Sequence, residues 1–352
     1  MDNNLISCKN IWNSLLEYSK KYYEETGKFP TRRQLYLRTK GTSLFSQVAQ
    51  NVANRLVRSM RGMTARRKVG IKAGFPRFKS IERTKSFTYP QFGFRLNSKL
   101  WLSGIGEISI RKHREIEGKI KTLIIKKLPS GKWFAVFTSE MEKATCGKEG
   151  PAAGLDLGID NFVYTSDGEI IENPRHFKKA EQKLGNADKR LSRKKKGSKN
   201  KGKARIKVAT AYEKLTNKRK DFLHKTSRKL VEKYSVIAIE DLDTVRMARS
   251  FLAKSVLDCS WAEFSSMLAY KAEDAGCGIV LVNPANTTSE CSNCGSVKKK
   301  SLAERWHKCA CGASMHRDLN AAMNILKRAT AGTAGSNASG KEAPTLVGKL
   351  LR

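Results

Sequence analysis

The chain has 352 residues and a formal net charge of +37, more residues than one compact core usually holds, so we expect two or three domains. The excess of Lys and Arg predicts a polyanionic partner. We favour nucleic acid over a membrane, because the sequence has no apolar run of about 18 residues and no signal peptide at residues 1–4. Four scattered cysteines are interpreted as reduced thiols of a cytoplasmic protein: Cys8, Cys146, Cys259 and Cys277.

The first part of the chain changes from helical to strand periodicity. Apolar residues recur at three and four residues within 7–60, as in Ile11, Leu15 and Leu16, which predicts a small helical region broken at 26–30. The arginines on the other faces of its second helix fit either a solvated face or a binding surface. Between residues 85 and 140 the apolar period is two, and 129–132 has the composition of a hairpin turn. That region is predicted to be a compact antiparallel sheet or barrel.

A linker at 143–151 leads to a third region. Residues 154–159 are predicted to form a buried strand, followed by a strand at 162–165 and a tight turn at 166–168. The next stretch, 178–233, is helical and holds 22 Lys and Arg against 5 Asp and Glu. Such a stripe can track a phosphate backbone, although a merely solvated helix pair is the alternative. Within it, residues 191–199 are predicted to be a flexible basic loop that binds nucleic acid through Arg193, Lys194, Lys195, Lys196 and Lys199.

Strand, helix and strand then alternate towards the C-terminus. An apolar strand at 236–242 stops at two acids, Glu240 and Asp241. A helix is expected at 261–275 and another apolar strand at 278–282. The tail, 331–352, is rich in Gly, Ala, Ser and Thr and is predicted to be disordered.

Two close cysteine pairs follow the last strand. The spacing Cys291-x-x-Cys294 and Cys309-x-Cys311 can place four sulfurs tetrahedrally around one Zn²⁺. Four unrelated thiols or two disulfides are the alternatives, and His307 could replace one sulfur. We therefore expect a structural zinc ion.

Three acids occupy positions where they could converge. Asp156 ends the first strand of the third region, Glu240 ends a later strand, and Asp318 begins the helix after the cysteines. In an open α/β sheet functional groups gather at strand ends, and clustered carboxylates are explained by divalent cations that neutralise them. Two such ions can activate water and stabilise the leaving oxygen of a phosphodiester. Each acid also has an ordinary interpretation. Asp156 could be a turn residue, with Asp160 as the true acid. Glu240 could be a solvent-exposed acid at a strand end, and Asp318 could cap its helix.

Taken together, these motifs resemble a known family, the RNA-guided TnpB nucleases of insertion sequences and the related type V CRISPR effectors. The resemblance spans almost the whole chain and is densest over residues 150–328. Its motifs are Gly154-Leu155-Asp156-Leu157-Gly158, Ser166-Asp167-Gly168, Leu191-Ser192-Arg193-Lys194, Val236-Ile237-Ala238-Ile239-Glu240-Asp241-Leu242, the two cysteine pairs, and Arg317-Asp318-Leu319-Asn320-Ala321-Ala322. The chain departs from the family in entering a helix almost directly after Met1, which suggests a truncated start, and in its short C-x-C pair.

The resemblance implies a fold class: an α/β RNase H-like (RuvC-like) nuclease domain with a zinc-ribbon insertion, preceded by a helical recognition domain and a small β-barrel wedge domain. The implied boundaries are 1–80 for recognition, 81–145 for the wedge, 146–288 and 314–330 for the nuclease, and 289–313 for the zinc-ribbon, target-nucleic-acid-binding insertion.

It also implies roles and partners. Asp156, Glu240 and Asp318 would be catalytic acids holding Mg²⁺ or Mn²⁺, supported by Arg317 and Asn320. The partners would be a guide RNA and a double-stranded DNA target, with the protein a monomer or a weak dimer on RNA. The expected activity is RNA-guided DNA cleavage; a nuclease-inactive RNA-guided repressor and a transposase acting directly on transposon ends are the alternatives.

Overall fold

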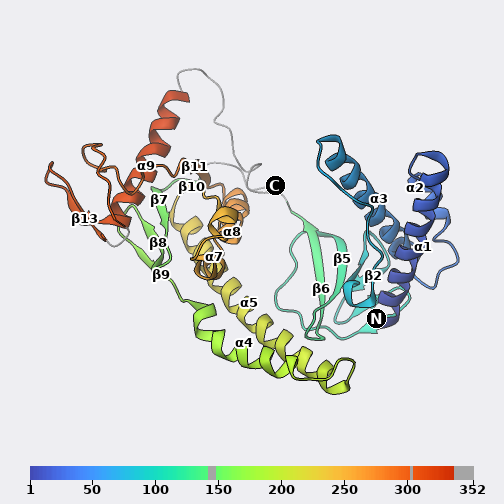
Figure 1. Ribbon diagram of the computed structural model, residues 1–352. Helices are drawn as coiled ribbons and strands as arrows, with labels where there is room; N and C mark the ends of the chain where they lie inside the picture. Colours follow the sequence, from blue (N-terminus) through green and yellow to red (C-terminus); the bar gives the residue numbers. More distant parts are fainter. Residues whose placement is uncertain (142–147, 302–303, 337–352) are drawn as a thin grey trace. The chain divides into compact units, whose positions relative to one another are not determined.

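The computed structural model describes residues 1–141, 148–301 and 304–336. The chain divides into two compact units, Met1–Glu142 and Lys143–Arg352 (Figure 1). Most of the predicted linker, like Cys146, lies outside the described residues. Within the described part of the chain, no helix is long and apolar enough to cross a membrane.

The first unit joins helices to antiparallel sheets. Its helices are α1 (Asp2–Thr26), α2 (Arg32–Leu37) and α3 (Ser46–Lys68), followed by the 3₁₀ turn η1 (Ile81–Arg83). Its strands are β1 (Ser86–Tyr89), β2 (Phe94–Leu96), β3 (Leu100–Leu102), β4 (Gly106–Ile108), β5 (Lys119–Lys127) and β6 (Trp133–Glu140). They form two three-stranded sheets, β1-β5-β6 and β2-β3-β4, so of the two predicted forms the described residues adopt open sheets and no closed barrel. The predicted turn joins β5 to β6, with Gly131 at φ 88°.

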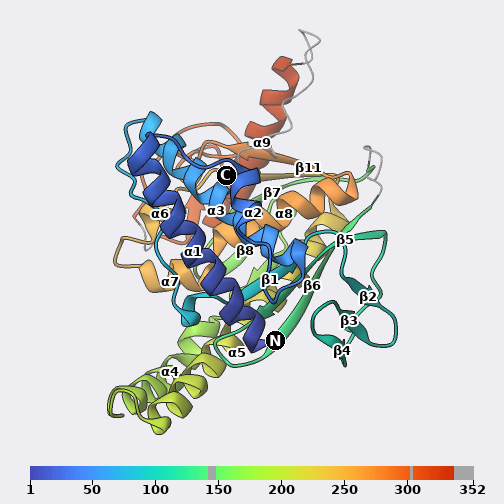
Figure 2. The same cartoon turned by 90° about the vertical axis from the view of Figure 1, so that its right-hand side faces the viewer.

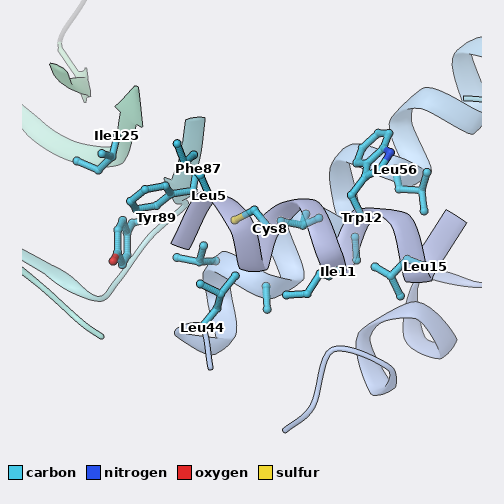
Figure 3. Close-up of a cluster of buried hydrophobic side chains, with 14 of the residues drawn as sticks. Leu5, Cys8, Ile11, Trp12, Leu15, Leu44, Leu56, Phe87, Tyr89 and Ile125 are labelled. Carbon is cyan, nitrogen blue, oxygen red and sulfur yellow. The ribbon is translucent and has the colours of Figure 1, made fainter. Parts of the chain in front are cut away.

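One hydrophobic core runs through both parts of this unit. Leu5 and Cys8 of α1 pack in the same buried cluster as Phe87, Tyr89 and Ile125 of the sheet (Figure 3). The predicted boundary between a helical domain 1–80 and a β domain 81–145 therefore does not separate two cores. The amphipathic helices cover the sheet, so the two parts share their buried apolar surface.

The second unit is a three-layer α/β arrangement. Its elements are β7 (Ala152–Leu157), β8 (Asn161–Thr165), β9 (Ile170–Glu172), α4 (His176–Ser192), α5 (Lys199–Lys233), β10 (Val236–Glu240), α6 (Thr244–Met247), α7 (Ala253–Cys259), α8 (Trp261–Ala275), β11 (Gly278–Val282), β12 (Trp306–Lys308), β13 (Ser314–His316) and α9 (Arg317–Ser336). Five strands form a mixed sheet in the order β11-β10-β7-β8-β9. The predicted helix 261–275 and strand 278–282 are confirmed; β9 was not predicted.

The faces of this sheet are covered by different helices. Leu155 and Ile237 pack with residues of α5 and α8, such as Leu230 and Phe264. Ala238 packs on the opposite face with Ile325 of α9, so the sheet lies between α5/α8 and α9 (Figures 1 and 2). Side chains of a strand alternate between faces, so the residues next to Leu155 point towards α9.

Two segments that were predicted to be irregular are partly helical. Residues 191 and 192 end α4, and Ser198 caps α5 by accepting a hydrogen bond from the Lys201 amide at 3.1 Å, so the predicted flexible loop 191–199 is reduced to 193–198. Helix α9 continues to Ser336, which corrects the prediction of disorder for 331–336. Adding a residue to an existing helix gains a backbone hydrogen bond without a new nucleation cost. The rest of the predicted tail lies outside the described residues.

Candidate active site and metal centre

The sheet brings two of the three predicted acids together. Strands β7 and β10 are parallel neighbours, with Leu155 paired to Ile239. Asp156 and Glu240 each come one residue later and therefore leave the same face of the sheet, the one that α9 covers. Two acids 84 positions apart in the sequence thus become neighbours through strand pairing.

Helix α9 supplies the third acid because it can approach β7 closely. A Cβ atom on Gly154 would lie 2.1 Å from the Ala322 carbonyl oxygen and 2.6 Å from the Leu326 amide nitrogen. Only glycine allows this approach. Asp318 lies in the first turn of α9 and its side chain is 14 % exposed. The close packing of α9 against β7 therefore directs its acidic N-terminal end to the face that carries Asp156.

Asp156 is in an unfavourable environment for an isolated carboxylate. It is 9 % exposed. Burial raises the pKa of its carboxyl group well above the ordinary value, the charges of Glu240 and Asp318 raise it further, and only Arg317 opposes them; within the described residues no hydrogen bond stabilises the ionised form. A buried carboxylate without a donor and beside two like charges fits a site for cations.

Glu240 and Asp318 have protein partners. The Thr287 hydroxyl donates a hydrogen bond of 2.5 Å to Oε1 of Glu240. Burial raises the pKa of Glu240, and this hydrogen bond together with Arg328 opposes the rise. The Asp318 amide donates to Nδ1 of His316 at 3.3 Å, and that ring nitrogen lies 3.8 Å from Oδ2 of Asp318. Thr287 therefore holds the Glu240 carboxylate, whereas His316 binds Asp318 through its backbone amide.

The predicted supports, Arg317 and Asn320, hold the segment that precedes α9. Nη1 of Arg317 donates to the carbonyls of Ser301 and Glu304 at 3.1 and 3.3 Å. Asn320 is fully buried, and it accepts a hydrogen bond from the Ser292 amide at 2.9 Å while donating to the Glu290 carbonyl at 2.7 Å. Both side chains thus form hydrogen bonds with backbone groups. Arg317 interacts with Asp156 only through its charge.

The four predicted cysteines converge. Their Sγ atoms all lie within 4.8 Å of one another: Cys291, Cys294, Cys309 and Cys311. The Sγ atoms of Cys291 and Cys311 are 3.7 Å apart and those of Cys294 and Cys309 are 3.5 Å apart. Four sulfurs at about 2.3 Å from a tetrahedral zinc ion are separated by similar distances, whereas a disulfide requires about 2.05 Å. The donor set fits Zn²⁺, and the four cysteines are not bonded to one another in the structure.

Hydrogen bonding also prepares one of these sulfurs for a metal. Ser296 Oγ lies 3.2 Å from Sγ of Cys309 and, with the Cys311 amide, lowers the pKa of Cys309 to about 6. The thiolate is the form that binds metal. His307 lies outside the sulfur cluster: it is 1 % exposed and its Nδ1 contacts Lys300 Nζ.

The three carboxylates are more widely spaced than the sulfurs. Among the described residues, the cysteines alone form a group of three or more metal-binding side chains with ligand atoms all within 4.8 Å. The alternative acid, Asp160, is about half exposed and forms ion pairs with Arg175 and Arg305. It is already neutralised by arginines, unlike Asp156.

The predicted basic residues lie at the tip of a helical hairpin. Helices α4 and α5 run antiparallel, and the tip residues Arg193, Lys194, Lys195, Lys196 and Lys199 are all exposed. No acidic residue occurs between Lys189 and Tyr212. At the other end of α5, Lys233 pairs with Asp167 and Glu169 at 2.8 Å. The unneutralised charge is thus concentrated at the tip.

Sequence reasoning missed four residues of this site: Gly154 as a packing residue, Thr287, His316 and Asn324. Asn324 is 2 % exposed, and its Nδ2 donates to the carbonyls of Thr287 and Glu290 at 2.9 and 2.8 Å. A signal was available for Asn324, because Asn320 and Asn324 are four residues apart and share one face of a helix. Thr287 has no such signal, since its partner Glu240 is distant in the sequence. The position of His316 two residues before Asp318 is local, but its ring contact with Tyr164 depends on the fold.

Comparison with known proteins first defines the class. Residues 137–250 match a family described as "Probable transposase", and residues 261–325 match the "Cas12f1-like, TNB domain" family. The fold is similar to that of a cryo-EM structure of a Cas12f1 complex with single guide RNA and target DNA, with a TM-score of 0.59, 16 % identity, and coverage of 92 % of this chain and 81 % of that one. The protein therefore has the fold of this Cas12f1 structure.

Relatives in sequence narrow the class to a family. A Streptomyces pristinaespiralis protein named as a candidate RNA-guided DNA endonuclease is 37 % identical over 75 % of this chain and 67 % of its own length. The InsQ protein of Escherichia coli K12, named in the same way, is 32 % identical over 72 % of this chain and 68 % of its own length. The chain belongs to the TnpB family of RNA-guided DNA endonucleases, as the motifs predicted.

Proposed function

We propose that this protein cuts DNA at a site selected by a guide RNA, and that the cutting site is the acidic face formed by Asp156, Glu240 and Asp318 in an RNase H-like (RuvC-like) domain. The observation that carries the proposal is the buried Asp156 carboxylate, which lacks a hydrogen-bond donor among the described residues and interacts with two further acids. Such a group needs cations, and Mg²⁺ or Mn²⁺ prefers carboxylate oxygens.

The chain's own residues position this chemistry. Bound in a pair, the metal ions would activate water and stabilise the leaving oxygen of a phosphodiester. Strand pairing orients Asp156 and Glu240, the Thr287 hydroxyl orients the Glu240 carboxylate, and the first turn of α9 presents Asp318. Because the scaffold holds the carboxylates before any substrate arrives, little reorganisation is needed during reaction.

The cysteine centre would serve as a structural zinc site that keeps α9 in place. Asn320 and Asn324 connect the backbone at Glu290 and Ser292, beside the first cysteine, to the buried face of α9. A zinc ion that closes the loop from Cys291 to Cys311 would stabilise this connection. Residues 289–313 would then act as the zinc ribbon that contacts target nucleic acid.

The guide RNA and the double-stranded DNA target would be held by basic surfaces. The exposed tip of the α4–α5 hairpin suits a phosphate backbone, because its cations have no acidic neighbours in sequence. In the first unit, the helices within 1–80 would recognise the heteroduplex and the sheets within 81–145 would serve as the wedge. Base pairing would select the target sequence, with the protein a monomer or a weak dimer on RNA.

The test is cleavage by a ribonucleoprotein isolated from cells that express the gene with its flanking DNA. The RNA that copurifies is sequenced, and plasmids carrying the matching target with randomised flanks are incubated in Mg²⁺ with wild type and with Asp318→Ala. We expect RNA-dependent cutting by the wild type only. Guided binding without cutting would favour a repressor, and RNA-independent joining of transposon ends would favour a transposase.

A further inference from the structure

An exposed tryptophan stands on the cysteine-bearing segment. Trp306, on β12, is 53 % exposed. Its Nε1 donates a hydrogen bond of 2.9 Å to Ser314 Oγ on the paired strand β13, so the orientation of the indole is fixed and its one polar atom is satisfied. The exposed part of this ring offers a ligand an apolar π surface rather than a hydrogen-bond donor.

A series of ring interactions connects this indole to the acidic site. Trp306 meets His316 edge-on, with centroids 6.3 Å apart and planes at 90°. His316 lies parallel to Tyr164, with centroids 5.3 Å apart and planes at 10°. Tyr164 on β8 is the cross-strand partner of Asp156, and His316 accepts the Asp318 amide hydrogen bond. The aromatic residues are therefore built onto the elements that position two of the acids.

We propose that Trp306 is a stacking platform for an unpaired nucleobase of the strand that enters the acidic site, an inference that rests on the proposed nuclease function. An aromatic face accepts any base, which suits an enzyme whose sequence choice is made elsewhere. Lys308, two residues further along β12, is exposed on the same face of the strand as Trp306 and suits a polyanionic ligand. A base held on Trp306 would keep the neighbouring phosphodiester close to the carboxylates. Holding the substrate strand in position in this way increases the rate of cleavage.

The first experiment compares Trp306→Leu with Trp306→Phe in the assembled ribonucleoprotein. Stacking of one base is worth about 1–3 kcal/mol, so Trp306→Leu should lower kcat/KM for target cleavage about 5- to 150-fold, and Trp306→Phe should restore most of the loss. Phe251→Leu is the matched control, because Phe251 is an aromatic residue that is 91 % exposed on the segment between α6 and α7. It should cut like the wild type.

The second experiment does not require cleavage. Single-stranded DNA containing 2-aminopurine is added to Asp156→Ala protein and to Asp156→Ala/Trp306→Leu protein, and the quenching of the base analogue is measured. Quenching should occur in the first and be lost in the second, with unchanged zinc content. Equal quenching in both proteins would overturn the proposal, as would equal defects of the Leu and Phe variants with zinc retained. If quenching is seen but the wild type never cuts, the nuclease proposal fails and the stacking site stands.

Discussion

The acidic face of the sheet and the tip of the α4–α5 hairpin carry opposite charges and are built in opposite ways. The acidic face has three carboxylates whose positions depend on strand pairing, on Gly154 and on α9. The tip has a run of exposed cations with no acid among them in the sequence. Where a site has only a few buried carboxylates, the loss of any one removes its activity. Where many exposed cations contribute to binding, the loss of one removes only part of the affinity. Single substitutions should therefore be severe at the acidic face and graded at the tip.

The largest effect is expected at Asp156. Asp156→Ala should reduce guided DNA cleavage by at least about 1,000-fold while RNA binding stays near wild type, because metal-bridging carboxylates act as a unit and RNA affinity resides in cations elsewhere. Single-turnover cleavage in Mg²⁺ measures the first quantity and filter binding the second. Asp160→Ala is the control: its ion pairs with Arg175 and Arg305 are exposed and each is worth little, so the effect should be small. Near wild-type cutting by Asp156→Ala would remove this residue from the site.

Loss of the zinc site should come next in size. Purified protein should contain about one zinc ion per chain, and Cys291→Ser should release it. The melting temperature and cleavage should then fall, because the hydrogen bonds that join the backbone at Glu290 and Ser292 to Asn320 and Asn324 of α9 are no longer anchored by the metal. Cys277→Ser is the control, since Cys277 is buried outside the sulfur cluster and should leave the zinc content unchanged. Metal analysis that finds no zinc in clean wild-type protein contradicts the interpretation of the cysteines.

The close packing of α9 on β7 can be tested by adding one methyl group at Gly154. Gly154→Ala places a methyl group 2.1 Å from the Ala322 carbonyl oxygen, and such overpacking costs about 1–3 kcal/mol or more. Unfolding in denaturant should show this loss together with reduced cleavage. Gly185→Ala on α4 is the matched control, with nothing within 4 Å of the added Cβ. It should stabilise the protein by up to about 1 kcal/mol through helix propensity. A stable, active Gly154→Ala protein would mean that α9 does not need this approach.

The raised pKa of Asp156 gives a pH dependence with a definite sign. A carboxyl group with a raised pKa in the folded state stabilises the protein fully below its ordinary pKa, and this stabilisation is lost as the pH rises through the folded-state pKa. In chelator, wild-type protein should therefore lose stability relative to Asp156→Asn as the pH rises from about 4. Melting temperatures across a pH series measure the difference, and Mg²⁺ should reduce it. Asp160→Asn is the control and should follow the wild type. The prediction is contradicted if the melting temperatures of wild type and Asp156→Asn change in parallel with pH.

The smallest effect per substitution is expected at the tip. Replacing Arg193, Lys194, Lys195, Lys196 and Lys199 by Gln should weaken RNA binding regardless of sequence and flatten the salt slope by about 0.7–0.9 for each phosphate that is no longer neutralised. The control replaces cations at the other end of α5 that are already paired with acids, Lys220, Lys225 and Arg228. Their change in slope per charge should be smaller. Equal slopes for wild type and the tip variant would move the RNA-binding surface elsewhere.

Local sequence patterns were sufficient for much of the second unit. The helix Trp261–Ala275 and the strand Gly278–Val282 agree with the structure at both ends, because their apolar periodicity and flanking breaks are local. The spacing of the two cysteine pairs also predicted that their sulfurs converge, because this spacing restricts how four sulfurs can be arranged. Strand ends next to acids indicated where Asp156 and Glu240 would lie.

Tertiary structure decided what depends on residues far apart in the chain. Such residues form the shared core of α1–α3 and the sheet in the first unit, the close approach at Gly154 and the place of His316 between Trp306 and Tyr164. The same holds for the extension of α9 to Ser336, where an existing helix continued through a composition that predicts disorder. Sequence by itself determined which side chains are candidates for the chemistry. Only packing decided how closely they approach, because the distance between two elements is set by every side chain between them.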